Sequence, residues 1–265
     1  MATPRVLILR APGTNCDVET AYAFEQAGAR AERVHINRVL EQTGTLSDYQ
    51  ILCVPGGFSY GDDIAAGRIL GNQIRHHLAG HLREFREAGK LILGICNGFQ
   101  VLIKSGVLLD ALPGDATAGP LSPATLTWND SGKFEDRWVH LNVAVEKSVF
   151  LAGIRSMYLP VAHAEGKFVA RDRQQLDSLD QAGQLVLRYC QNDECANGEV
   201  PYPLNPNGSQ LNVAGVSDTS GRVLGLMPHP ERHIDSTQHP RWTRGAGGQV
   251  GDGLAVFVNA VAYFR

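Results

Sequence analysis

The sequence predicts an α/β protein: a mostly parallel sheet covered by helices on both faces, with an antiparallel extension. Two observations carry this prediction. Short apolar runs alternate with helical patterns up to residue 105, whereas the middle of the chain holds strand-like runs separated by turn signals such as Asn-Asp-Ser-Gly at 129–132. Alternating strands and helices are typical of parallel sheets, and strands joined by turns are typical of antiparallel ones. We expect one domain over residues 1–265.

In the first half, apolar runs predict the strands, and apolar residues spaced three or four apart predict the helices. The predicted strands span residues 6–9, 31–36, 51–54 and 91–95, and the predicted helices span residues 18–27, 64–78, 81–88 and 97–104. Asn15 is placed to cap the first helix. Because ligands bind parallel sheets at the carboxyl ends of the strands, we expect a site in the loops after residues 54 and 95.

In the second half, the predicted strands span residues 125–128, 139–145, 157–161, 185–189, 213–216 and 223–227, followed by a helix over 254–263. We expect the first four of these strands to form an antiparallel edge of the same domain. The last two then return to the main sheet, and the helix closes the fold.

The most informative segment is Leu-Ile-Leu-Gly-Ile-Cys-Asn-Gly-Phe-Gln at 91–100, where an apolar strand runs directly into a helix. Gly94 and Gly98 suit a sharp strand-to-helix turn, because side chains there would collide. Such a turn exposes Cys96 at its apex and places the thiol at a helix N-terminus, which favours the thiolate. We therefore predict a nucleophile. The alternative is a buried structural cysteine.

A second segment, Met-Pro-His-Pro-Glu-Arg at 227–232, follows an apolar strand. In extended backbone, His229 and Glu231 point to the same side, so the carboxylate can orient the imidazole toward a thiol. Together with Cys96 they supply the nucleophile, base and orienter of an acyl-transfer site. Taken alone, a histidine between prolines is more often a rigid surface turn.

A third segment, Pro-Gly-Gly-Phe-Ser-Tyr-Gly-Asp at 55–62, follows the strand at 51–54. Its backbone carries no side chain at Gly57 and can approach a ligand closely. The N–H of Gly57 and the N–H of Asn97, the residue after the nucleophile, are candidate donors to the oxyanion of a tetrahedral intermediate. On its own, the segment also fits an ordinary glycine turn.

The composition indicates a cytoplasmic enzyme. With 43% hydrophobic residues and a net charge of −3 over 265 residues, the chain can bury a large core and lacks the basic stripe of nucleic-acid binders. No apolar run approaches the ~20 residues that span a bilayer. Five cysteines without the density of a secreted disulfide scaffold imply a reducing compartment. Cys190 and Cys195 have the spacing of half a zinc site, but no second pair stands nearby, so we predict no metal.

Three of these motifs, at 55–62, 94–100 and 227–232, resemble the class I (triad) glutamine amidotransferase family. Within that family, four further segments resemble the glutaminase subunits of phosphoribosylformylglycinamidine synthases, from de novo purine biosynthesis. They lie at 12–17, 160–166, 205–209 and 252–261. The resemblance implies one flavodoxin-like type 1 domain. The family usually has a glycine where this chain has Ala164, which affects the backbone around His163.

The resemblance also implies an activity. The Cys96 thiolate attacks the side-chain amide of glutamine, and His229, held by Glu231, protonates the departing ammonia and then activates water. Ammonia passes to a synthetase subunit that binds ATP, Mg and formylglycinamide ribonucleotide, with a small third subunit. This chain has no phosphate-loop or dinucleotide motif, so no cofactor is expected in it.

Gln100, Phe58 and His163 are candidate substrate-binding residues. Gln100 lies one helical turn beyond the nucleophile and is placed to clamp the amino acid end of glutamine, whereas His163 and Glu165 fit either a pocket or a structural loop. Three alternatives stay open. They are a glutaminase serving another synthetase, a cysteine hydrolase of related fold, and a catalytically silent regulatory subunit. The intact Cys96, His229 and Glu231 disfavour the last.

Overall fold

The computed structural model describes residues 3–110, 122–191, 198, 200–246 and 248–265. Nine strands of this described part form one sheet in the order β2-β1-β3-β4-β11-β10-β9-β6-β7, and β5 and β8 form a separate pair. The strands are β1 Arg5–Arg10, β2 Arg30–His35, β3 Ile51–Val54, β4 Leu91–Ile95, β5 Ala124–Thr127, β6 Glu135–Val143, β7 Ser156–His163, β8 Lys167–Ala170, β9 Leu187–Cys190, β10 Val213–Ser217 and β11 Val223–Leu226.

The sheet changes direction in its middle. Strands β2, β1, β3, β4 and β11 run parallel to one another, whereas β10, β9, β6 and β7 follow in antiparallel pairing, beginning with the pair of β11 and β10. The prediction of a mostly parallel sheet with an antiparallel extension is therefore confirmed. The placement of the strand near 125 in that extension is wrong, because β5 pairs with β8 outside the main sheet.

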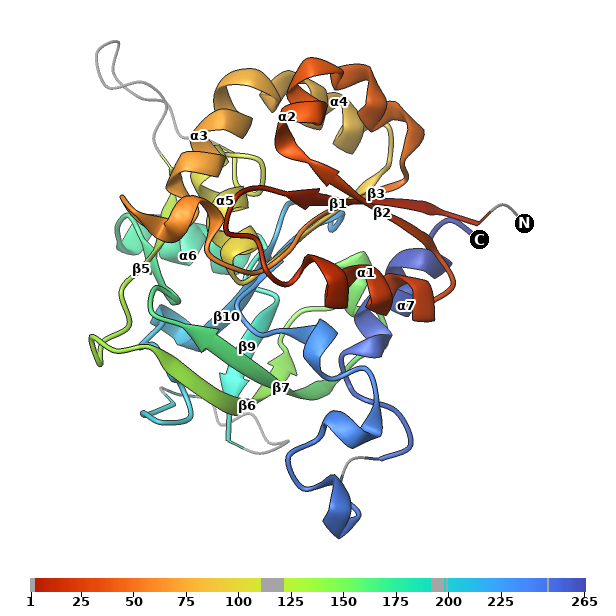
Figure 1. The fold of residues 1–265 in the computed structure, drawn as a ribbon. Helices are drawn as coiled ribbons and strands as arrows, with labels where there is room; N and C mark the ends of the chain where they lie inside the picture. Colours follow the sequence, from red (N-terminus) through yellow and green to blue (C-terminus); the bar gives the residue numbers. More distant parts are fainter. Residues whose placement is uncertain (1–2, 111–121, 192–197, 199, 247) are drawn as a thin grey trace.

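Helices cover both faces of the parallel half. They are α1 Asp17–Gln26, α2 Ile36–Glu41, α3 Arg68–His77, α4 Ala79–Glu87, α5 Asn97–Ser105 and α7 Leu254–Ala262, whereas α6 Arg173–Gln181 packs against β8. Helices α1 and α7 lie on the opposite side of β1 and β3 from α2, α3 and α4 (Figure 1). Every residue of β3 and β4 is buried, as expected for strands covered on both sides. None of the helices in the described ranges is long and apolar enough to cross a membrane.

Two predicted helix starts are wrong for local reasons. Helix α3 begins at Arg68 rather than at residue 64, because Gly67 adopts left-handed backbone and donates its N–H to Asp62 Oδ1. Asn15 does not cap α1, because Cys16 occupies the cap position. The Oδ1 atom of Asn15 instead accepts a hydrogen bond from the thiol of Cys16. The sequence also missed α2, α6 and β8.

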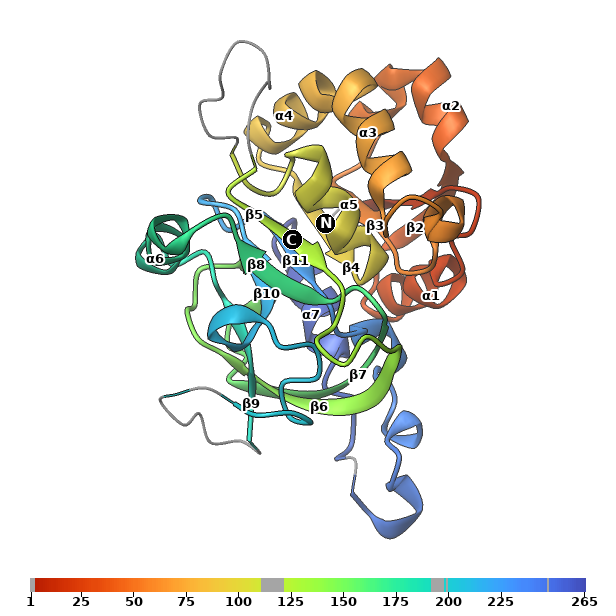
Figure 2. The ribbon, with the colours of Figure 1, turned by 90° about the vertical axis from the view of Figure 1, so that its left-hand side faces the viewer.

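The loops that follow β1, β3, β4 and β11 all leave the carboxyl ends of parallel strands. Because Leu226 pairs with Ile95 in parallel register, the residues after β11 emerge next to those after β4. Figure 2 shows α5 beside β4 and close to β5, with the strongly curved β6 and β7 below them. The topology therefore gathers four loops, distant in sequence, around one end of the sheet.

Candidate active site

Cys96 forms the turn between β4 and α5. Its backbone has φ 51° and ψ −106°, which is an unfavourable conformation for a residue with a side chain. The backbone N–H of Cys96 donates to the Leu226 carbonyl at 2.8 Å, so the turn is fixed to β11. The expectation that the thiol is exposed is wrong. Cys96 is only 5% exposed, and its sulfur lies 3.6 Å from the carbonyl oxygen of Ala162 at the end of β7.

The two glycines of this turn are required by close backbone contacts, as the sequence predicts. A Cβ on Gly94 would lie 2.7 Å from the Gly98 carbonyl oxygen, and a Cβ on Gly98 would lie 1.8 Å from the Val54 carbonyl oxygen. The start of α5 therefore packs directly on the backbone of β3. This packing holds the nucleophile turn beside the segment that carries Gly57.

We expect Gly98→Ala to destabilise the protein by about 3 kcal/mol, because backbone atoms of β3 cannot move away from the added methyl group. Chemical denaturation of the purified chain measures the effect. Gly80→Ala is the matched control, since a Cβ there meets no atom within 4 Å and Gly80 lies in helix α4. Equal stability of the two variants would contradict the packing argument.

His229 and Glu231 meet as a buried pair. His229 Nδ1 lies 2.6 Å from Glu231 Oε1, and both residues are at most 2% exposed. The backbone N–H of His229 donates to the Pro160 carbonyl at 2.8 Å, which attaches the segment to β7. The predicted extended backbone holds at His229 but fails after it, because residues Pro230–Arg232 form a 3-10 turn. That turn, rather than strand alternation, brings the carboxylate back to the imidazole.

The surroundings of His229 favour the protonated form of its imidazole. Burial alone lowers its pKa, but the charges of Glu231 and Cys96 outweigh burial, so the pKa of His229 lies well above its ordinary value. Nε2 of His229 is buried and makes no hydrogen bond within the described ranges. With Nδ1 held by Glu231, Nε2 is the nitrogen left for chemistry at the nearby sulfur.

Gly57 and Asn97 lie on opposite sides of the nucleophile turn. Gly57 has φ 136°, and a Cβ there would lie 2.7 Å from the backbone nitrogen of Asn15. Asn97 opens helix α5, and its side chain organises the segment after Gly57: Oδ1 accepts from the Ser59 N–H at 3.1 Å, and Nδ2 donates to Asp62 Oδ1 at 3.1 Å. The sequence predicts a role for the backbone of Asn97 but not for its side chain.

A cavity of about 240 Å³ opens beside the thiol. Of the eight predicted site residues, five line it, namely Gly57, Phe58, Cys96, Gln100 and His163, whereas Asn97, His229 and Glu231 do not. The size suits a ligand smaller than a drug-like molecule, such as an amino acid.

Two of the predicted substrate-binding residues have defined places around the cavity. Phe58 is 45% exposed and packs against Phe134, with ring centroids 6.4 Å apart, so it lies at the rim. Gln100 is buried, and its amide is already hydrogen-bonded at both ends, accepting from Asn97 Nδ2 at 2.9 Å and donating to the Glu165 carbonyl. The Gln100 side chain therefore ties α5 to the loop after β7, and a substrate contact would compete with these bonds.

His163 has a fixed tautomer. Nδ2 of Asn129 donates to the carbonyls of Lys133 and His163, so Oδ1 of Asn129 is the acceptor that lies 3.1 Å from His163 Nδ1. Nδ1 of His163 therefore carries the proton, and Nε2 is an acceptor without a partner among the described residues. Burial and the charge of His229 lower the pKa of His163 to about 3, so the ring is neutral at physiological pH.

Sequence reasoning missed two neighbours of the site. Asp62 lines the cavity in left-handed backbone, and burial raises the pKa of its carboxyl. The Gly-Asp pair at 61–62 is a turn signal that was available. Cys16 lies against His229, and nothing local in its sequence indicates that contact.

One group of potential metal ligands lies close together in the described part of the chain. The ligand atoms of Cys16, His229 and Glu231 are all within 4.8 Å of one another. However, Glu231 already holds His229 Nδ1, and the guanidinium of Arg232 lies 3.1 Å from the Cys16 sulfur. The ligand atoms are thus already engaged in hydrogen bonds, so we interpret the group as a hydrogen-bonded cluster. Of the two cysteines that have the spacing of half a zinc site, Cys195 lies outside the described residues.

Comparison with known families gives a match over nearly the whole chain. Residues 3–264 match the model of the CobB/CobQ-like glutamine amidotransferase domain. Phosphoribosylformylglycinamidine synthase subunit PurQ of Dehalococcoides mccartyi is 47% identical, covering 100% of this chain and 99% of that relative. The protein of the same name from Archaeoglobus fulgidus is 40% identical, covering 98% of this chain and 97% of the relative.

Solved structures agree at the level of the fold. A chain of the PurLQS structure from Thermotoga maritima is 32% identical, with a TM-score of 0.72 and 100% coverage of both chains. The glutaminase domain of CTPS from Trypanosoma brucei has a TM-score of 0.55 at 13% identity, covering 98% of this chain and 93% of that one, which shows a shared fold only.

Proposed function

Because this chain belongs to the family of CobB/CobQ-like glutamine amidotransferases, we propose that Cys96, His229 and Glu231 are its catalytic triad. The chain is a glutamine amidotransferase, and its function is that of the glutaminase subunit of phosphoribosylformylglycinamidine synthase. The observation that carries the triad is the buried 2.6 Å contact between His229 Nδ1 and Glu231 Oε1, beside the strained turn of Cys96.

In the first half of the reaction, the Cys96 thiolate attacks the side-chain carbonyl carbon of glutamine and forms a tetrahedral oxyanion. The N–H groups of Gly57 and Asn97 stabilise this oxyanion. The His229 imidazolium then gives its Nε2 proton to the leaving nitrogen, the carbon–nitrogen bond breaks, and ammonia departs. A glutamyl thioester remains on Cys96.

In the second half, neutral His229 takes a proton from water, and the resulting hydroxide attacks the thioester carbon. Collapse of this second intermediate breaks the carbon–sulfur bond and releases glutamate and the Cys96 thiolate, while His229 is again an imidazolium. Glu231 holds Nδ1 of His229 throughout and fixes the tautomer of the imidazole. The Gln100 and His163 side chains and the Phe58 ring shape the cavity for glutamine.

The ammonia is used by a partner. We assign ATP, Mg and formylglycinamide ribonucleotide to a synthetase subunit, with a small third subunit in the same cytoplasmic complex. The similarity of this chain to a chain of the PurLQS structure from Thermotoga maritima supports the presence of partner subunits. No nucleic acid or membrane takes part. The test is ATP-dependent formation of formylglycinamidine ribonucleotide by the co-purified subunits with glutamine as the nitrogen source. Failure with glutamine and success with ammonia would refute the proposed role of this chain.

We expect the isolated chain to hydrolyse glutamine slowly and the assembled complex to do so faster, by about 10²-fold to 10³-fold. The reason is that docking can rotate the peptide unit at Gly57, a residue with φ 136°, into or out of the oxyanion hole. Loss of one such donor costs a rate factor of about this size. Steady-state glutaminase kinetics with and without saturating partner and nucleotide measure the effect. An unchanged turnover number would exclude this gating while leaving the triad in place.

A further inference from the structure

A second cysteine, Cys16, also lies against the catalytic imidazole. Cys16 precedes helix α1, is 1% exposed, and has its sulfur within 4.8 Å of both the His229 nitrogen and the Glu231 carboxylate. Gly56 lies between the two groups: a Cβ there would lie 2.8 Å from His229 Cε1 and 3.1 Å from Cys16 Sγ. The imidazole is therefore enclosed by Cys16, Gly56 and Glu231, which come from three different loops.

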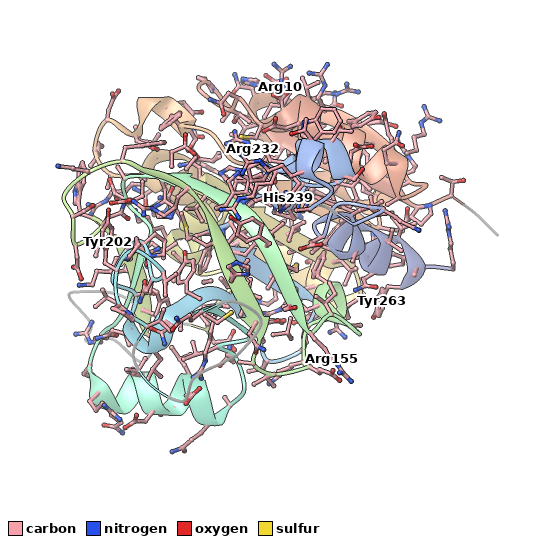
Figure 3. All side chains as sticks on the ribbon, turned by 90° about the horizontal axis from the view of Figure 1, so that it is seen from below. Arg10, Arg155, Tyr202, Arg232, His239 and Tyr263 are labelled. Carbon is pink, nitrogen blue, oxygen red and sulfur yellow. The ribbon has the colours of Figure 1, made fainter. Side chains whose placement is uncertain are left out.

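The hydrogen bonds around Cys16 show whether its sulfur acts as a donor or an acceptor. The thiol donates to Asn15 Oδ1 at 3.2 Å, and Nη2 of Arg232 donates to the sulfur at 3.1 Å. Nε of Arg232 is paired with Glu19 Oε1 of helix α1 at 3.0 Å, so the charge of the guanidinium is balanced. Figure 3 labels Arg232 between Arg10 and His239 in the view from below. With its proton given to Asn15, the Cys16 sulfur presents lone pairs to the nearby ring of His229.

The same segment also holds the loop that carries Gly57. The backbone N–H of Cys16 donates to the Gly56 carbonyl at 3.3 Å, Phe58 N–H donates to the Gly13 carbonyl at 2.9 Å, and Thr14 forms a bridge with Gly57. One short stretch before α1 thus contacts both the base and the proposed oxyanion donor. A residue at position 16 that fits this space and offers a lone pair can align the imidazole with the thiol.

We propose that Cys16 is a positioning residue for His229, whose sulfur, held between Arg232 and Asn15, keeps the imidazolium aligned between Glu231 and Cys96. This inference rests on the proposed triad. Cys16 does not touch the substrate and takes no covalent step. Its contribution is to hold the ring and to stabilise its protonated form.

Loss of Cys16 should shift the pH dependence of the glutaminase rate in a defined direction. The groups that face His229 are Glu231 of the 3-10 turn, Cys96 of the nucleophile turn, His163 at the end of β7 and Cys16, with Arg232 behind Cys16. Burial lowers the pKa of His229, whereas Glu231, Cys96 and the hydrogen bond of Cys16 raise it. Removing Cys16 therefore lowers this pKa. Since the imidazolium is the general acid, the alkaline limb of the rate profile moves to lower pH.

The test uses Cys16→Ala and Cys16→Ser in the assembled complex, with glutaminase kinetics from pH 6 to 10 as a chosen range. We expect Cys16→Ala to lower kcat about fivefold with KM for glutamine unchanged, as for loss of one neutral hydrogen bond, and to move the alkaline limb to lower pH. Cys16→Ser keeps a lone pair at shorter reach, so its rate should stay within about twofold of wild type and its limb should move less.

Cys53→Ala is the control, because this thiol in β3 is also fully buried and lies near Glu231, but it is not among the groups that shift the pKa of His229. It should leave the alkaline limb in place. Ammonia-dependent synthesis by the same complexes shows whether each variant assembles. If Cys16→Ala does not assemble, the position of the alkaline limb in the Cys16→Ser complex tests the proposal. An unshifted limb in the assembled Cys16 variants overturns the inference. Glutamine use that survives loss of Cys96 would instead overturn the proposed triad.

Discussion

Cys96→Ser should abolish glutamine-dependent synthesis by the complex and leave ammonia-dependent synthesis at its wild-type rate. The loss in glutaminase kcat should be on the order of 10⁴-fold or more, because removal of the nucleophile of a triad leaves only binding and oxyanion stabilisation. The ammonia-dependent rate is unaffected, since free ammonia bypasses this chain. Both rates are measured on one preparation by formation of formylglycinamidine ribonucleotide.

Serine is a suitable replacement because it is close to cysteine in size, and the strained turn at residue 96 tolerates little change in volume. Cys53→Ala is the control for loss of a buried thiol near the site, since Cys53 lies in the neighbouring strand β3. It should retain glutamine use. A Cys96→Ser complex that still used glutamine at near wild-type rate would show that another group is the nucleophile.

The second large effect is expected at the base. His229→Ala should lower glutaminase kcat by about 10²-fold to 10⁴-fold, because proton transfer to the leaving nitrogen is lost. Glu231→Gln should cost less. The amide still reaches Nδ1 of the imidazole, but it no longer supplies the charge that, with Cys96, holds the pKa of His229 above its ordinary value. In Glu231→Gln the alkaline limb should therefore also move to lower pH.

Glutaminase kinetics on both variants, with ammonia-dependent synthesis as the assembly control, measure these losses. A fully active His229→Ala complex would rule out the triad. A Glu231→Gln variant more impaired than His229→Ala would show that the carboxylate does more than orient and stabilise the ring.

The strands that carry the site could be predicted from the sequence, because strands buried on both faces consist of continuous apolar residues. Residues 51–54 and 91–95 are uninterrupted apolar runs, each ended by a residue that turns the chain, and the structure has strands at those bounds. Helix α6 was missed for the opposite reason. Only Leu176 and Leu179 of this helix are buried, so its apolar pattern is weak, although the Asp172 side chain that caps it was a readable signal.

The site could be predicted as far as its components are close in sequence. His229 and Glu231 are two residues apart, so their pairing follows from local geometry. The contact between Cys16 and His229 joins residues 213 positions apart and depends on the parallel order of β1, β3, β4 and β11, which no local pattern records. The tautomer of His163 likewise depends on Asn129, which reaches it from another strand connection.

The order of strands determines when, during translation, the catalytic residues can come together. Strand β11 comes last in sequence among the described strands, yet it lies between β4 and β10 near the centre of the sheet. Until residues 223–226 leave the ribosome, the edge of β4 has no neighbour there, and Cys96 lacks both the carbonyl of Leu226 that fixes its turn and the histidine that follows it. A nascent chain therefore carries the thiol without its acid catalyst. Glutamine hydrolysis therefore begins only after β11 and the segment that carries His229 have joined the sheet between β4 and β10.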